Sequence, residues 1–227
     1  MAGMNSRQEH GAEATHTRIL DVAERLVQTR GFNGFSYADI ASEVGITKAS
    51  LHYHFATKAE LGVTLIARYS EAFAAALQRI SATPADAARR LRAYVKLYAD
   101  VLTDQRMCLC GMLAAEYATL PPPMQTAIRA FFEANEGWLA QQLELGVRAG
   151  ALALRVPARD AARMLVGALE GEMLVARAWG EPARFAAAAA LLLGQLAVRA
   201  ADGRVARRPR SRAGARGHAA RVPGART

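Results

Sequence analysis

Apolar residues recur at helical spacing along most of the chain. In the first clear instance, Ile19, Val22, Ala23, Leu26 and Val27 follow the i, i+3, i+4, i+7, i+8 pattern of one buried helix face. No segment shows the two-residue alternation of apolar and polar positions that marks a half-buried strand. The pattern therefore predicts an all-helical protein, with further helices at about 58–80, 91–102, 108–119 and 124–148, from 157 onward, and at about 182–201.

Residues 36–61 carry the pattern of two short helices joined by a tight turn, followed by the start of a third helix. Gly45 ends the first of them, because glycine adopts the left-handed conformation without a Cβ penalty. Thr47 can cap the second, whose buried side is formed by Leu51 and Phe55, one turn apart. The remaining side chains lie on the outer face, so the segment is predicted to be a helix-turn-helix with an exposed recognition helix.

The same patterns divide the chain into four parts. Residues 1–13 are polar and expected to be disordered, and residues 14–57 form the helix-turn-helix domain. Its three short helices are marginally stable alone, so the long helix that follows is expected to support them. Residues 58–202 form a larger helical domain, and residues 203–227 form a tail rich in Arg, Ala, Gly and Pro that is expected to be disordered.

Charge is placed unevenly along the chain. The formal net charge is +9, and residues 203–227 contain eight arginines and no acidic residue, which leaves 9 − 8 = +1 for the remainder. The tail is therefore interpreted either as an arm that binds DNA nonspecifically or as an extension without a function.

Several classes of protein are excluded by composition. The two cysteines cannot form a disulfide framework, no apolar run is long enough for a transmembrane helix, and the N-terminus lacks the apolar core of a secretion signal. A cytoplasmic location is expected. The sequence contains no glycine-rich phosphate loop, nucleophile elbow or metal-spaced His/Glu set, so neither an enzyme, a cofactor nor a metal site is expected.

The segment Gly45–Leu61, together with Thr17–Leu26 and Gly31–Ser36, resembles the DNA-binding region of TetR-type (TetR/AcrR) transcriptional regulators. His52 departs from the pattern, since the family more often has tyrosine there. The resemblance implies that Lys48 and Ala49 touch base edges, whereas most of the others contact phosphates. The DNA-contacting residues that it implies are Tyr37, Thr47, Lys48, Ala49, Ser50, His52, Tyr53, His54 and Lys58.

The family resemblance also implies a homodimer whose two recognition helices lie in successive major grooves of a palindromic operator, with release by a small-molecule inducer. Small residues, Gly167, Gly171 and the alanines at 186–190, suit either a four-helix dimer interface or close packing within one subunit. The inducer is expected to be a small hydrophobic or aromatic compound. The side chains available to line its cavity, or alternatively to form ordinary core, are Tyr69, Phe73, Tyr94, Tyr98, Cys108, Met112, Phe131, Phe132, Trp138, Met164, Met173 and Trp179.

Two alternatives to this repressor remain. The segment from Met107 to Tyr117 resembles that of family members that sense electrophiles or oxidants, with Cys108 at the position of the modified cysteine. A helix N-terminus lowers the pKa of a thiol and increases its reactive thiolate fraction, although a buried inert thiol is the commoner fate of a free cysteine. The second alternative is a protein that binds nucleic acid nonspecifically through the arginine-rich tail.

Overall fold

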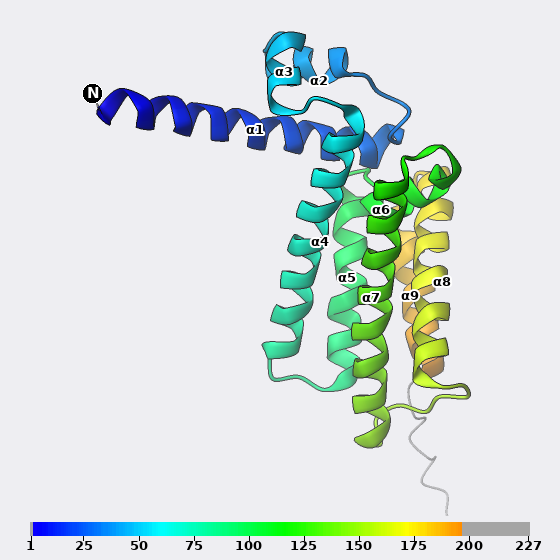
Figure 1. The fold of residues 1–227 in the computed structure, drawn as a ribbon. Coiled ribbons are helices and arrows are strands. Elements are labelled where there is room, and N and C mark those ends of the chain that lie inside the picture. Colours follow the sequence, from blue (N-terminus) through cyan, green and yellow to red (C-terminus); the bar gives the residue numbers. More distant parts are fainter. Residues whose placement is uncertain (1, 197–227) are drawn as a thin grey trace, which may run out of the picture.

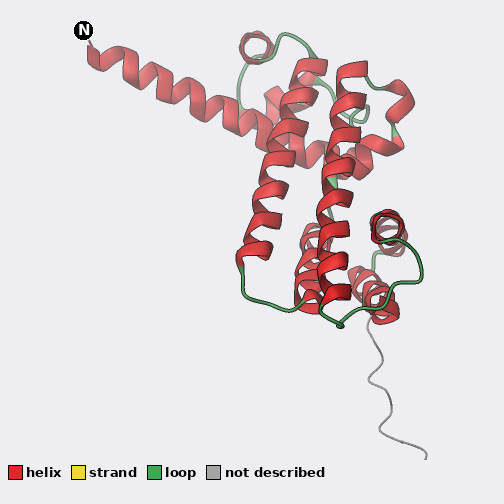
Figure 2. Ribbon diagram, turned by 60° about the horizontal axis from the view of Figure 1, so that its bottom comes forward, coloured by secondary structure: helices red, strands yellow, loops and turns green. Residues whose placement is uncertain are grey.

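The structure is a computed structural model that describes residues 2–196, and all of the regular elements in that range are helices (Figures 1 and 2). Every helix that the apolar pattern predicted is present, with a 3₁₀ turn at the end of the short segment. The elements are α1 (Ala2–Arg30), α2 (Tyr37–Val44), α3 (Lys48–His54), α4 (Lys58–Ala82), α5 (Ala87–Thr103), α6 (Leu109–Ala115), η1 (Tyr117–Thr119), α7 (Pro122–Arg148), α8 (Ala158–Trp179) and α9 (Pro182–Leu196).

The first three helices form a small head at one end of the molecule (Figure 1). The Asp39 carboxylate accepts hydrogen bonds from the backbone N–H and the hydroxyl of Ser36, which secures the start of α2. Gly45 takes the left-handed conformation with φ of 75°, and its N–H bonds the Ala41 carbonyl, so α2 ends where the sequence predicts. Ile40, Leu51 and Phe55 are buried and belong to the same core as the buried residues of α1.

The remaining helices form the body, in which α4, α5, α7, α8 and α9 run side by side (Figure 1). In this body, α7 packs against both α4 and α8, and α8 packs against α9. The helix α4 runs from the head into the body, where Leu61 and Leu65 are fully buried. The short α6 contacts α1, α4 and α7, so both α4 and α6 connect the body to the head.

The N-terminus differs from the sequence-based prediction. Residues 2–13 continue α1 without a break, whereas disorder was expected over residues 1–13. This segment contains no proline, and seven of residues 2–13 are Ala, Met, Arg, Gln or Glu, so the helix can propagate from the packed part of α1 through Gly3 and Gly11. The N-terminal part of α1 projects away from the rest of the molecule (Figure 1).

The predicted disorder of residues 203–227 and the predicted end of the last helix near residue 201 lie outside the described residues. Within the described range, no helix is long and apolar enough to cross a membrane.

Candidate nucleic-acid interface and aromatic cluster

The helix α3 presents one side to the outside of the head and one side to its core. Thr47 caps the helix by accepting a hydrogen bond from the Ser50 N–H at 3.1 Å. Leu51 is fully buried and Phe55 nearly so, which fixes the rotation of α3 on the head. The outer face is therefore set by the same packing that stabilises the helix.

Most of the residues that the sequence predicted to contact DNA lie on the outer face of α3. Lys48, Ala49, His52 and Tyr53 are exposed, and Tyr53 stands out with 84% of its surface accessible. Ser50 is half-buried on the same helix. A basic residue, a small residue and an exposed aromatic residue on one short helix suit entry into a major groove, where Lys can donate to guanine acceptors.

Two predicted contacts have roles inside the head. The Tyr37 hydroxyl donates to the Phe55 carbonyl at 3.0 Å, and burial, with Glu60 nearby, raises the pKa of Tyr37 to about 12. Tyr37 therefore joins α2 to the end of α3. His54 is half-buried beside His16 of α1, and burial, followed by the His16 charge, lowers the pKa of His54.

Lys58 is placed differently from the prediction that it contacts phosphate. Its ammonium donates to the carbonyls of Phe32 and Phe35 in the turn between α1 and α2, and lies 4.6 and 4.1 Å from the centres of the two phenyl rings. Burial lowers the pKa of Lys58, against the opposing effects of Glu116 and Asp39. The pattern on α4 showed the position of Lys58 but could not show that this turn folds over it.

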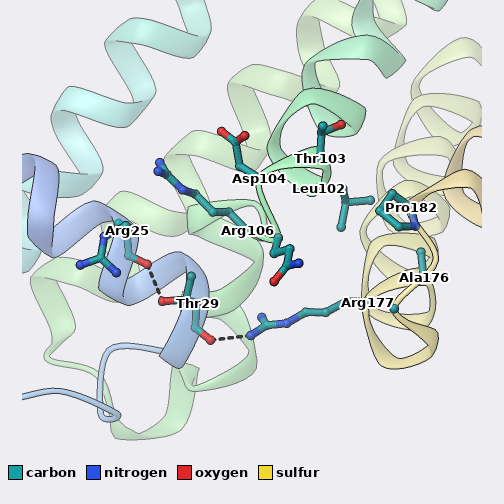
Figure 3. Close-up of a pocket in the computed structure, with 11 residues that line it drawn as sticks. Arg25, Thr29, Leu102, Thr103, Asp104, Arg106, Ala176, Arg177 and Pro182 are labelled. Atoms are coloured by element: carbon teal, nitrogen blue, oxygen red, sulfur yellow. Dashed lines mark hydrogen bonds between the residues drawn. The ribbon is translucent and has the colours of Figure 1, made fainter.

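The junction between head and body is joined by hydrogen bonds to the end of α1. Glu116, after α6, accepts from the backbone N–H of Phe32 and of Asn33. Arg177 of α8 donates to the carbonyls of Gln28 and Thr29 in the last turn of α1, and the Gln28 carbonyl also accepts from the Met107 N–H. Figure 3 shows this side chain reaching from α8 to Thr29 across a cavity of about 660 Å³. These hydrogen bonds connect α6 and α8 directly to the end of α1.

Six of the predicted ligand residues meet in one aromatic cluster in the body. Tyr94 is fully buried, donates to the Asn135 side-chain oxygen at 2.8 Å and lies 3.1 Å from the Tyr98 hydroxyl, which accepts from the Asn135 amide at 2.9 Å. Burial is the main cause that raises the pKa of both tyrosines. The ring neighbours of this network are Tyr69, Phe73, Phe131 and Trp138.

A groove of about 410 Å³ lies between α4 and α7, beside this cluster. Its wall is apolar apart from Ser70, Glu71 and Asn135, and it includes Phe73 and Phe131 from the cluster. A site of this size and composition suits a small organic molecule.

Other predicted cavity residues lie elsewhere. Met164 is 67% exposed and Trp179 is 64% exposed, so neither belongs to the aromatic cluster, and Met164 instead lines a separate cavity of about 360 Å³ beside α8 and α9. The face of α8 that carries Met164 is as apolar as its buried face, and spacing alone does not separate the two. Met173 is fully buried, Phe132 packs edge-on against Phe131, and Met112 contacts the Arg177 guanidinium.

Cys108 precedes α6, as predicted, but its pKa moves in the opposite direction to the one expected. Burial, followed by the neighbouring Glu170 carboxyl, raises the pKa of the Cys108 thiol well above its usual value. Burial and Glu170 act on Cys110 in the same way. Desolvation and a buried acid outweigh the dipole of the short α6, so both cysteines are held as thiols.

Two residues of the site were missed by sequence reasoning, Glu170 and Asn135. Glu170 lies one turn after Val166 and next to Leu169 on the buried face of α8, and Asn135 lies between Phe131 and Leu139 on α7. A polar residue within an apolar stripe was the available signal in both cases.

Similarity to known proteins agrees with this architecture. The bacterial regulatory proteins of the tetR family match residues 19–62, and the tetracyclin repressor-like C-terminal domain matches residues 87–192. A TetR-family transcriptional regulator from Agrobacterium tumefaciens is 33% identical, with a TM-score of 0.80 over 82% of this chain and 100% of its own.

Two curated relatives are more distant or match a shorter region. The regulator TtgR from Pseudomonas putida is 36% identical over 63 residues, and the chain spans 30% of the length of that relative. The transcriptional repressor NemR from Escherichia coli K12 is 26% identical over 150 residues, which are 63% of this chain and 72% of that protein.

The fold and the exposed face of α3 define a helix-turn-helix protein with a helical C-terminal domain. The full-length match and the two domain matches then assign the family: the chain belongs to the TetR family of bacterial regulatory proteins.

Proposed function

We propose that the protein is a transcriptional repressor that binds a palindromic operator as a homodimer and is released by a small molecule bound in its body. The exposed face of α3 carries this proposal, because Lys48, Ala49 and Tyr53 stand outward on a helix whose other side is locked into the head. Family membership and the similarity to NemR, a transcriptional repressor, support it. Selection of bound sequences from random DNA will identify the operator.

Lys48→Ala is expected to weaken binding to the selected operator by about 1–3 kcal/mol and to relax the sequence preference at one base pair, because it removes a donor to a base edge. Fluorescence anisotropy with the operator and with random DNA measures both effects. Lys96→Ala is the matched control, because Lys96 is an exposed lysine on α5, far from the head in sequence. Unchanged operator affinity in Lys48→Ala would show that α3 does not read bases through this residue.

The dimer is proposed to form through an exposed apolar stripe on α8, here named the α8 stripe. Met164, Gly167, Gly171 and Leu174 are spaced three, four and three residues apart, and all four are exposed. Apart from the backbone of α8 itself, a Cβ at either glycine would meet no atom of the described residues within 4 Å. Leu191 of α9, 71% exposed, adds apolar surface. A stripe with small residues at its centre allows a helix of a second copy to approach closely.

Leu174→Glu is expected to shift the protein from dimer to monomer at micromolar concentration, because it buries a charge without a partner in the interface. Sedimentation velocity measures the change. Val147→Glu places the same charge on a 43% exposed apolar position of α7, outside the stripe, and should leave the dimer intact. A dimeric Leu174→Glu protein would place the interface elsewhere.

Release is proposed to proceed through α6 and α8. A ligand in the aromatic cluster would contact α4, α5 and α7 directly. The neighbouring helices α6 and α8 are joined to the head by the hydrogen bonds of Glu116 and Arg177. Binding energy that favours one position of these helices then favours one spacing of the two heads. The raised pKa of both thiols favours this reversible mechanism over modification of Cys108.

A further inference from the structure

Glu170 is a half-buried acid in the body that forms no ion pair with any of residues 11–196. It lies on α8 and presses against α6, where a Cβ at Gly111 would come within 2.2 Å of Glu170 Oε2. Its other oxygen, Oε1, is buried and has no hydrogen-bond partner in the described part of the chain. Burying a carboxylate in this way is unfavourable unless another group compensates its charge.

The groups that surround Glu170 are neutral donors. Cys108, which precedes α6, forms a side-chain hydrogen bond with the Glu170 carboxyl, and the Glu170 charge adds to burial in raising the pKa of Cys110, Tyr69, Tyr94 and Tyr98. Among residues 11–196, no lysine, arginine or histidine forms an ion pair with Glu170. Within the described residues, the site therefore offers one negative charge that no positive charge neutralises.

The aromatic rings next to these donors add to the preference for a cation. Tyr69 lies 6.3 Å from Phe73 and 5.6 Å from Phe131, measured between ring centres, and its hydroxyl reaches the Cys108 sulfur at 3.7 Å. The faces of aromatic rings carry partial negative charge and attract ammonium groups. A path of contacts thus leads from the two phenylalanines through Tyr69 and Cys108 to the carboxyl of Glu170.

The groove between α4 and α7 has the same sign of charge. Phe73 and Phe131 belong both to its wall and to the aromatic cluster, so the groove reaches the outer side of the cluster. Among the described residues that line it, Glu71 is the one ionisable group and none is basic. An anionic ligand would meet two carboxylates on this route, whereas a cationic ligand would be attracted at both ends of it.

We propose that Glu170 is the anionic contact for a protonated organic amine with an apolar or aromatic body, which enters the aromatic cluster through the groove between α4 and α7. The ammonium group pairs with Glu170, and the apolar body takes up positions against Phe73 and Phe131. The proposal deepens the proposed function by giving the chemical class of its small molecule. Within the described residues, no group of three or more His, Cys, Asp or Glu side chains is arranged to hold a metal ion, so a metal ion is a poorer occupant than an amine.

Binding of the amine also involves a proton. Burial raises the pKa of Glu170 to about 7, so part of the protein holds Glu170 as the neutral acid near neutral pH. An ammonium ion binds to the carboxylate form, and the displaced proton goes to solvent. Affinity for an amine is thus expected to rise with pH up to the point where Glu170 is fully ionised.

Isothermal titration calorimetry of the full-length protein without DNA tests the proposal. The probes are 2-phenylethylamine, benzyltrimethylammonium and the neutral 2-phenylethanol. At pH 8, both cations are expected to bind at least tenfold more tightly than the alcohol, and affinity for benzyltrimethylammonium, whose charge does not change with pH, should fall at least fivefold at pH 6. Trp138, stacked on Tyr94 with ring centres 5.5 Å apart, provides a fluorescence readout of the same binding.

Variants separate charge pairing from packing. Glu170→Gln keeps the shape of the side chain and should abolish both the preference for cations and its pH dependence. Glu170→Asp should retain the preference with lower affinity, and Glu172→Gln, on the same helix, should behave as the parent. Equal affinity for alcohol and cations, absence of cation binding at millimolar concentration, or unchanged cation binding in Glu170→Gln would each overturn the proposal. Because no DNA is present, failure here is distinct from failure of the operator experiments.

Discussion

Glu170→Gln is expected to stabilise the protein at pH 8 by up to about 3 kcal/mol and to leave its stability at pH 4.5 nearly unchanged. Burial raises the pKa of Glu170 from its usual value of 4.5 to about 7. One pKa unit corresponds to about 1.36 kcal/mol, so the shift from 4.5 to about 7 means that ionising this carboxyl opposes folding by about 3 kcal/mol. Glutamine occupies the same space and carries no charge at any pH.

The sign of the pH dependence follows from the same shift. Below the unfolded pKa of 4.5, Glu170 is protonated in both states and its burial costs no ionisation energy. As pH rises toward 7, the unfolded chain loses this proton first, so the parent loses stability, and above about 7 the loss is complete. Urea unfolding at pH 4.5, 6 and 8 measures the difference between parent and variant.

Glu172→Gln is the control for this experiment. This variant removes another acid from the same helix, α8. The difference in the free energy of unfolding between this variant and the parent should not grow with pH. If the difference between Glu170→Gln and the parent is the same at pH 4.5 and at pH 8, the carboxyl of Glu170 is not held in a desolvated position.

Lys58→Met is expected to lower the free energy of unfolding by about 2–4 kcal/mol, because two carbonyls in the turn after α1, those of Phe32 and Phe35, lose their charged donor. Methionine retains most of the contact area against the two phenyl rings, so the loss reports the hydrogen bonds and the cation–π contacts. Urea unfolding followed by circular dichroism measures it.

Lys48→Met provides the matched comparison on the same head. Lys48 is exposed at the start of α3, so this variant should keep the parental stability while losing operator affinity. The two lysines would then separate the stability of the head from its contact with DNA. Parental stability in Lys58→Met would contradict the internal role and return Lys58 to the set of phosphate contacts.

The apolar spacing and the local capping signals determined the fold class and the positions of the helices. Helix periodicity, the Ser36–Asp39 pair, Thr47 and the left-handed Gly45 act within a few residues of one another, so they can be read directly along the chain. The outer face of α3 was predictable for the same reason, because Leu51 and Phe55 identify the opposite face. The aromatic residues of α4, α5 and α7 that form the cluster were also predicted to be available to line a cavity. The sequence could not separate them from other predicted residues that lie outside the cluster.

Only the tertiary structure decided which polar groups are buried and against what. Glu170 meets Gly111 from another helix, Lys58 meets a turn more than twenty residues earlier, and Glu116 binds the Phe32 N–H across 84 positions. Met164 and Met173 lie on one helix with similar apolar neighbours, yet one is exposed and the other is fully buried. Periodicity shows that a helix has an apolar face, but the partner of each face, and with it the desolvation that changes the pKa of Glu170 and of Cys108, is set by residues distant in the chain.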